Sequence, residues 1–480
     1  MLRACDVDSL GRLDATAQAA LVRDREVTAE ELVTAAIARI EARNPALNAV
    51  VTPGYERALD EVRAALPDGP FTGVPFLLKD LIAEQAGVRH TAGSAYLRDH
   101  VSATDQELVV RLRRAGLVIL GKTSTPEFGL LPTCEPALFG PTRNPWDPTR
   151  SPGGSSGGSA TAVAAGMVPF AHANDAAGSI RYPASCCGLF GFKPTRGRNP
   201  LGPAYGDAWG GLAAEHAITR SVRDSAALLD ATAGPDLGDP YVAPQPPGPF
   251  VADVSRAPGR LRIGYSLRTP AGHPVHPDCI AALHDAVELC ERLGHDVVEA
   301  DLPGFTREVG NAIRTVFQAA SVAALDRGIR VLGRPPGPDE LELYTRTYWE
   351  RAHHVSAGDY LLAVGELQRF ARVVARFLTT VDVYLTPTLA QLPPVLGELT
   401  STEDDPLRAG RRGGELAAFA CVIANVTGGP AMSVPLYWNA DGLPVGVHFL
   451  GQYGDEARLF RLAGQLEAAR PWADRWSGNR

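Results

Sequence analysis

Lysine is almost absent from this sequence of 480 residues. Only Lys79, Lys122 and Lys193 occur among the 46 basic residues, and all the others are arginines. A bias in the base composition of the source genome is the simplest interpretation of the general preference for arginine. Each remaining lysine marks a position where a permanently charged guanidinium is not an equivalent substitute for a titratable amine.

Excess positive charge and long apolar runs are also missing. The formal net charge is −8 at pH 7, so the chain lacks the basic surface with which nucleic-acid-binding proteins contact phosphates. No uninterrupted apolar run approaches the roughly 20 residues that cross a membrane. The opening residues, MLRACDVDSLGRLDATAQ, contain no apolar core of a signal peptide. We expect a cytoplasmic protein with neither a nucleic-acid nor a membrane partner.

The cysteines show no pairing pattern. Their number, seven, is odd, and no two are spaced as C-x-x-C or accompanied by a histidine cluster. Neither a disulfide framework nor a metal site is therefore predicted, and we expect free or buried thiols in a reducing compartment. These residues are Cys5, Cys134, Cys186, Cys187, Cys279, Cys290 and Cys421.

Short apolar runs separated by helical patterns predict an α/β fold. Residues 72–81 and 115–124 have the composition of buried strands that end in polar residues. Residues 259–266, 277–294 and 295–302 form a strand–helix–strand unit. Such units build parallel sheets covered by helices, so a mostly parallel sheet is expected.

Helices are predicted before and after these strands. Thr28 and Glu31 form a capping box for a helix that is expected to end before Pro45. Residues 305–380 are largely helical in pattern, and residues 457–469 form a closing helix.

The glycine- and serine-rich stretch SPGGSSGGSATAVAAG, residues 151–166, carries the strongest local signal. A flexible linker is disfavoured because the stretch continues directly into a predicted helix at about 159–165 and a strand near 167–172. A phosphate-binding loop is disfavoured because Ser159 and Ala160 follow Gly158, where that motif requires lysine and a hydroxyl residue.

A hydrolase elbow of the form G-x-S-x-G is a third interpretation, centred on Ser155 or Ser156. Residues 144–152 precede it and contain three prolines, which argues against the central strand that an elbow follows. An elbow serine also needs a histidine partner, and His448 is the best candidate.

A fourth interpretation joins three separate positions. Ser179 follows small residues whose backbone N–H groups could bind a developing oxyanion. Lys79 ends a predicted buried strand, where desolvation would lower its pKa and leave a neutral amine. Such an amine can take a proton from Ser155, which in turn takes one from Ser179, without any histidine.

The blocks GVPFLLKD, GGSSGGSA, NDAAGSIRYPASCCGLFGFKPTRGR and NVTGGPAMSVP resemble the amidase signature family, whose members use a Ser–cisSer–Lys triad. The resemblance runs from about residue 14 to residue 469, and NDAAGS is similar to the branch that contains hydrolases of the cyclic 6-aminohexanoate dimer. It implies a large mixed, mostly parallel central sheet with helices on both faces. It also implies no metal or organic cofactor.

The resemblance assigns a role to each motif residue. It places the nucleophile at Ser179, the bridging serine, after a cis peptide bond, at Ser155 and the base at Lys79. Gly154, Asp175 and Arg181 are expected to hold the loops that carry the catalytic serines. The backbone amides of four residues would form the oxyanion hole: Ala176, Ala177, Gly178 and Ser179. Most members have glycine where this chain has Ala177, which bears on the geometry of that hole.

Other polar residues of these blocks are expected to be structural. Lys122 and Lys193 are assigned to packing or to the site wall. Ser156 and Ser159 are assigned to cap or loop hydroxyls.

Residues 1–480 are predicted to form one domain. It comprises an N-terminal helical segment at about 1–65, a catalytic core at about 66–235 and a variable helical segment at about 305–380. The last would form one wall of the substrate pocket, with an apolar or aromatic surface from Tyr344, Tyr348 and Trp349.

We expect an amidohydrolase that cleaves a small cyclic or linear amide through an acyl-enzyme on Ser179, and that forms a homodimer. The alternative is the glutamine-hydrolysing subunit of a tRNA-dependent amidotransferase, which shares the triad. A third hypothesis is an esterase that uses Ser156 and a histidine.

Overall fold

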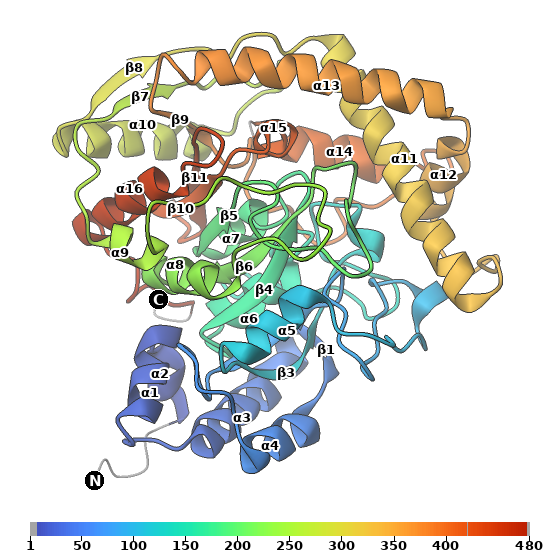
Figure 1. Ribbon diagram of the computed structural model, residues 1–480. Coiled ribbons are helices and arrows are strands. Elements are labelled where there is room, and N and C mark those ends of the chain that lie inside the picture. The colour runs from blue at the N-terminus through green and yellow to red at the C-terminus, as the bar shows by residue number, and fades with distance from the viewer. Residues whose placement is uncertain (1–6, 420, 478–480) are drawn as a thin grey trace.

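The computed structural model describes residues 7–419 and 421–477 (Figure 1). An 11-stranded sheet has the order β1-β3-β2-β4-β6-β5-β10-β11-β9-β7-β8. The strands are β1 (Val50–Pro53), β2 (Pro75–Lys79), β3 (Val118–Thr123), β4 (Phe170–Asp175), β5 (Phe190–Lys193), β6 (Ala214–Thr219), β7 (Arg262–Tyr265), β8 (Asp296–Glu299), β9 (Val383–Pro387), β10 (Ala431–Trp438) and β11 (Pro444–Leu450).

The predicted large mixed sheet is confirmed, but parallel pairing makes up less of it than expected. Strand β2 runs parallel to β3 and β4, and β7 runs parallel to β8 and β9. The other six pairings are antiparallel. Parallel neighbours need a crossover of a dozen or more residues, and connections such as residues 439–443 between β10 and β11 are too short for one.

The helices pack around this sheet. They are α1 (Val7–Arg12), α2 (Ala15–Arg23), α3 (Ala29–Leu47), α4 (Tyr55–Ala64), α5 (Glu107–Arg114), α6 (Gly157–Ala164), α7 (Arg181–Cys187), α8 (Val222–Thr232), α9 (Phe250–Val254), α10 (Pro277–Arg292), α11 (Arg307–Leu332), α12 (Leu343–Ala352), α13 (Ala357–Phe377), α14 (Arg408–Leu416), α15 (Cys421–Thr427) and α16 (Glu456–Ala469). Two short 3-10 helices span Ala95–Leu97 and Glu127–Gly129.

Strand β2 shows why both faces of the sheet carry helices. All its residues are buried, and successive side chains point to opposite faces. Leu77 packs with residues of α3, α6 and α7 on one face. Phe76 and Leu78 pack with residues of α2, α5 and α8 on the other. The predicted helical cover on both faces is therefore confirmed.

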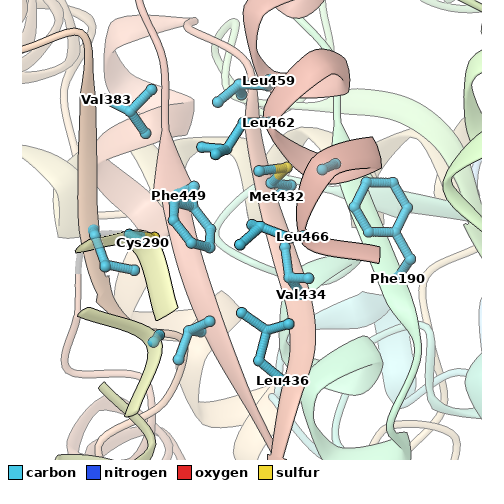
Figure 2. Packing of buried hydrophobic residues seen from close by; sticks show 14 of the residues in the cluster. Phe190, Cys290, Val383, Met432, Val434, Leu436, Phe449, Leu459, Leu462 and Leu466 are labelled. Atoms are coloured by element: carbon cyan, nitrogen blue, oxygen red, sulfur yellow. The ribbon is translucent and has the colours of Figure 1, made fainter. Parts of the chain in front are cut away.

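A second core lies where β10 and β11 meet α16 and α10 (Figure 2). Met432 and Val434 of β10 face Leu462 and Leu466 of α16, and all four are fully buried. Burying such side chains stabilises the fold by roughly 1.5–3 kcal/mol each. This core holds β10 and β11 in the sheet next to β5, the strand that pairs with β10.

The predicted helix with the capping box is α3, and its end differs from the prediction. Thr28 and Glu31 form the box, but Pro45 lies inside the helix instead of beyond it. The helix closes only at Asn48, which adopts the left-handed conformation and donates its N–H to the carbonyl of Asn44 at 2.7 Å. A proline in the last turn removes a single hydrogen bond, which this cap offsets.

Helices α11, α12 and α13 form the helical segment predicted at 305–380. In Figure 1 they lie at one side of the molecule, with α11 crossing α13. The rings of Phe305 and Phe370 pack edge to face at 5.8 Å where the segment joins the body. None of the helices within the described ranges combines the length and apolar character that a membrane crossing needs. The six described cysteines are free and buried, as predicted, while Cys5 lies outside the described residues.

Candidate active site

Lys79 is the last residue of β2 and is completely buried. Its Nζ donates hydrogen bonds to Ser155 Oγ at 2.7 Å and to Asn174 Oδ1 at 2.6 Å. Its backbone N–H donates to Nδ1 of His172 at 3.3 Å. The end of the strand therefore holds the amine against the serine that lies 76 residues later.

The surroundings of Lys79 favour its neutral form. Desolvation by burial lowers the pKa of Lys79 from 10.5 to about 7, although the nearby carboxylates of Glu215 and Asp175 act in the opposite direction. At pH 7 about half of the amine is therefore unprotonated. An unprotonated amine that touches a serine hydroxyl can act as a general base.

Ser155 stands in the loop that leads into α6. The peptide bond between Gly154 and Ser155 is cis, as the resemblance implied. Gly154 passes so close to the chain at Thr133 that a Cβ added there would lie 2.2 Å from the Thr133 carbonyl oxygen. Only glycine fits this position, and the close approach turns the Ser155 hydroxyl toward Lys79.

Ser179 stands in the turn between β4 and α7. The carboxylate of Asp175 shapes this turn by accepting the N–H of Gly178 at 2.7 Å and that of Ile180 at 3.2 Å. The Gly178 amide is thus already bonded to Asp175, and its place in the oxyanion hole stays a prediction. In the described part of the chain, the N–H groups of Ala176, Ala177 and Ser179 donate to no acceptor.

Gly178 serves the turn through its conformation. Its φ is +135°, and a Cβ added there would lie 2.3 Å from the ring of Tyr182. Any other residue would push that ring away and change the path of the turn. The glycine is therefore needed for shape, while the neighbouring amides stay open.

Asp175 and Arg181 form an ion pair, and both side chains are completely buried. Arg181 donates two hydrogen bonds to the Asp175 carboxylate, at 2.8 and 2.9 Å. Burial alone would raise the pKa of Asp175, but the guanidinium of Arg181 lowers it to about 2. Arg181 also donates to Asn425 Oδ1 and to His448 Nε2. This histidine is thus engaged in structure, which leaves the elbow hypothesis without its partner.

Arg181→Met is expected to lower the free energy of unfolding by about 3–5 kcal/mol, because it leaves the Asp175 carboxylate buried without a partner. Urea denaturation followed by circular dichroism measures the change. Arg262→Met is the matched control: it breaks an ion pair with Asp296 that is half exposed, and about 1 kcal/mol or less is expected. An equal loss in both variants would contradict a structural role for the buried pair.

The serines open into a cavity of about 710 Å³. Ser155 and Ser179 line it together with Asn174. Residues of α11 and α12 form one wall, and Tyr344 and Tyr348 stack at 5.5 Å on that wall. Trp349 does not line this cavity and packs edge to face against His353 instead.

The remaining lysines are also buried but lie apart from the serines. Nζ of Lys122 donates to the carbonyl of Ala83 at 2.6 Å and lies 4.0 Å from Asp80. Nζ of Lys193 donates to the carbonyl of Pro194 at 2.9 Å. Asp80 therefore pairs with Lys122 rather than with the adjacent Lys79. The structural assignment of Lys122 and Lys193 agrees with these contacts.

The neighbouring serines also make structural contacts. Ser159 lies within α6 and donates to the carbonyl of His172 at 2.7 Å. Ser156 precedes that helix and donates to the carbonyl of Asn174 at 3.3 Å. Neither hydroxyl is bonded to the Lys79 amine.

Sequence reasoning missed three polar residues around Lys79. Asn174 accepts a hydrogen bond from the Lys79 amine, and His172 is hydrogen-bonded to Glu215. All three are buried on β4 and β6, strands in which every residue is buried and half of the residues are apolar. A polar residue inside a buried strand was the available signal, but only the fold shows which amine it faces.

A sequence model of the amidase family matches residues 31–460. The chain is 41% identical over 478 residues to the 6-aminohexanoate-cyclic-dimer hydrolase of Paenarthrobacter ureafaciens, covering 96% of both chains. A solved structure of 6-aminohexanoate cyclic dimer hydrolase complexed with substrate superposes with a TM-score of 0.93 at 39% identity, covering 98% of this chain and 99% of that one. One subunit of the glutamyl-tRNA(Gln) amidotransferase from Thermotoga maritima superposes with a TM-score of 0.74 at 27% identity, covering 98% and 96%.

Proposed function

This chain belongs to the amidase family and is an amidohydrolase, and from that membership we propose that it cleaves carboxylic amides through an acyl-enzyme formed on Ser179. The observation that carries the proposal is the contact at 2.7 Å between a buried Lys79 amine and Ser155, which lines the same cavity as Ser179.

The first step is the attack of Ser179 Oγ on the carbonyl carbon of the amide. Ser155 accepts the proton of Ser179 while its own proton passes to the neutral amine of Lys79. The lowered pKa of Lys79, about 7, matches this task, since a base works best with a pKa near the operating pH. Asn174 Oδ1 accepts a hydrogen bond from the amine and keeps it directed at Ser155.

The amides of Ala176, Ala177 and Ser179 stabilise the negative oxygen that develops. They line the cavity beside the nucleophile and are not occupied by Asp175, which takes the Gly178 amide instead. Removing one such donor from a comparable hydrolase costs about 2.7–4 kcal/mol of transition-state stabilisation. The pair of Asp175 and Arg181 acts by fixing the turn that presents these amides.

The second step releases the amine product. Lys79 returns its proton through Ser155 to the leaving nitrogen, and the C–N bond breaks. Water then enters, loses a proton to the same relay and attacks the acyl group on Ser179. Each proton that leaves a nucleophile is thus returned to a leaving group, and the enzyme ends unchanged.

The substrate is proposed to be a small cyclic or linear amide, of which the cyclic dimer of 6-aminohexanoate is the first to test. The closeness of this chain to the hydrolase of that dimer supports the choice. The cavity of about 710 Å³ is large enough for a drug-sized molecule. The likeness to the amidotransferase subunit is weaker, with a TM-score of 0.74 against 0.93.

Mass spectrometry of the intact protein tests this proposal. The enzyme is mixed with the cyclic dimer, linear aliphatic amides, anilides or glutamine and quenched in acid within one turnover. An added mass equal to the acyl group, mapped to the peptide that contains Ser179, is expected with at least one amide. An adduct on Ser156 would support the esterase hypothesis. Release of ammonia from glutamine in preference to every other amide would favour the amidotransferase hypothesis.

A further inference from the structure

A second cavity of about 640 Å³ lies next to the catalytic cavity. The two cavities share three wall residues: Leu81, Ile82 and Trp209. The proposed mechanism uses nothing from the second cavity. Its position next to the catalytic cavity makes it a candidate site for part of a substrate.

Unusual backbone conformations are concentrated around this second cavity. Six residues other than glycine have positive φ in the described ranges, and four of them line it: Ile82 at +66°, Ala92 at +50°, Phe128 at +49° and Trp209 at +58°. A positive φ is a clear outlier for a β-branched residue such as Ile82. Such strain persists only where the surrounding structure enforces it, and it clusters at ligand-binding and active sites.

The shared wall is tied to the catalytic residues by hydrogen bonds. Ile82 is the centre of a three-residue turn in which the N–H of Ala83 donates to the carbonyl of Leu81 at 2.8 Å. Nδ2 of Asn174 donates to that same carbonyl at 2.8 Å, while its Oδ1 accepts from Lys79. One amide side chain therefore joins the wall to the amine of the proposed relay.

Small apolar side chains leave the space in the second cavity. Ala319, Ala320, Ala323 and Ala324 line it from one face of α11, where a larger residue at any of these positions would project into the cavity. Phe128 and Leu97 line it as well. The guanidinium of Arg327, which also borders the cavity, is engaged by the Ala204 carbonyl and stacks on the ring of Tyr205 at 4.0 Å. Glu84, His90, His100 and Asp207 border the cavity as well, so the apolar stretch formed by α11, Leu97 and Phe128 is the part of the lining that suits methylene groups.

We propose that the second cavity binds the far end of a linear aliphatic amide whose scissile bond lies at Ser179. The aliphatic chain of the substrate extends from the catalytic cavity past the indole of Trp209. The centroid of this indole lies 5.6 Å from the ring centroid of Phe317. This inference rests on the proposed function and names a substrate class for it. Each buried methylene is expected to raise kcat/KM about three- to fourfold until the chain fills the cavity.

Two chain-length series test the inference. One series varies the acyl group of N-acyl p-nitroanilides from two to fourteen carbons, and the other varies the alkylamine of N-alkyl acetamides. Ala323→Phe places a ring in part of the cavity, because Ala323 lines it and is exposed enough to accept a ring without repacking the core. Arg330→Phe is the matched control, since it adds the same ring to an exposed position of α11 outside both cavities.

The wild-type enzyme and Arg330→Phe are expected to show the same rise in kcat/KM with chain length in one of the two series. Ala323→Phe should hydrolyse the shortest substrate at the wild-type rate and lose the rise for longer chains, by about tenfold or more. Equal slopes in Ala323→Phe and the wild type, or no rise in either series, would overturn the inference while leaving hydrolysis of short amides intact.

A binding measurement separates this inference from the chemistry. Calorimetric titration of Ser179→Ala with acetamide, hexanamide and dodecanamide reports affinity without turnover. Tighter binding of the longer amides, abolished by adding Ala323→Phe, supports the second cavity even if Ser179 is not the nucleophile. Affinities that do not depend on chain length, or that Ala323→Phe leaves unchanged, would overturn it.

Discussion

Replacing Ser179 with alanine is expected to lower kcat for amide hydrolysis by about 10⁴- to 10⁶-fold, the loss seen when a serine hydrolase loses its nucleophile. The variant should fold and bind amides as before, because the turn around Ser179 is held by Asp175 and Arg181 and not by the hydroxyl. Steady-state assays with an amide that gives an acyl adduct measure the loss. The same adduct should disappear from the mass spectrum.

Two further variants make the result specific. Ser156→Ala removes a hydroxyl that donates to the Asn174 carbonyl at 3.3 Å and has no contact with Lys79, so a loss of less than about tenfold is expected. Ser155→Ala should be nearly as damaging as Ser179→Ala, and the double variant no worse, because residues of one relay fail as a unit. Full activity in Ser179→Ala together with none in Ser156→Ala would instead identify Ser156 as the nucleophile.

The positions at the centre of the site were predictable because each combines a rare residue with a distinct local context. Lys79 is one of three lysines and ends a wholly apolar run. Ser155 follows two glycines and Ser179 follows a run of small residues, contexts that allow tight backbone turns. Motif spacing then indicated that the three residues come together, and the structure brings Lys79 and Ser155 into contact and places Ser179 in their cavity.

The residues that adjust the site could not be predicted, because their contacts depend on strand pairing. Asn174 faces Lys79 across the adjacent strands β2 and β4, although 95 residues separate them in the chain. The capture of the Gly178 amide by Asp175 depends on how the turn closes, which composition does not encode. The wall of Leu81, Ile82 and Trp209 joins segments more than 120 residues apart.

The fold was predictable in its elements more than in its pairing directions. The apolar runs of β2 and β3 and the unit of β7, α10 and β8 are present at the predicted places. The antiparallel pairs in the middle of the sheet depend on which strands become neighbours, and periodicity within a strand is the same for either direction. Similarly, the end of α3 was misjudged because the cap at Asn48 outweighs the helix-breaking tendency of Pro45.

The pH dependence of kcat/KM is the second large effect, and it reports the ionisation of Lys79. Because the proposed base is the neutral amine and its pKa is about 7, kcat/KM should rise about tenfold per pH unit below that value and level off above it. Lys79→Arg should lose about 10²- to 10⁴-fold at every pH, since a guanidinium does not release its proton in this range. Retained turnover in Lys79→Arg would rule out the relay.

Asn174→Asp moves this ionisation without touching the amine itself. A carboxylate within 2.6 Å of Nζ stabilises the ammonium form, so the acidic limb of kcat/KM is expected to shift upward by about 1–3 pH units. Activity at pH 7 should then fall by about 5- to 500-fold and recover as the pH is raised toward 9 or 10. Asn174→Leu is the control, because it removes the hydrogen-bond acceptor without adding a charge and therefore cannot shift the acidic limb of kcat/KM to higher pH.

Recovery at high pH distinguishes a base that has become harder to deprotonate from a site that has been damaged. Distortion of the wall at Leu81, which Asn174 also holds, would lower kcat/KM by a similar factor at every pH. Only a change in the pKa of Lys79 confines the loss of kcat/KM to the acidic side of the pH profile. A limb in Asn174→Asp that coincides with the wild-type limb would therefore mean that Lys79 is not the group whose ionisation limits the reaction.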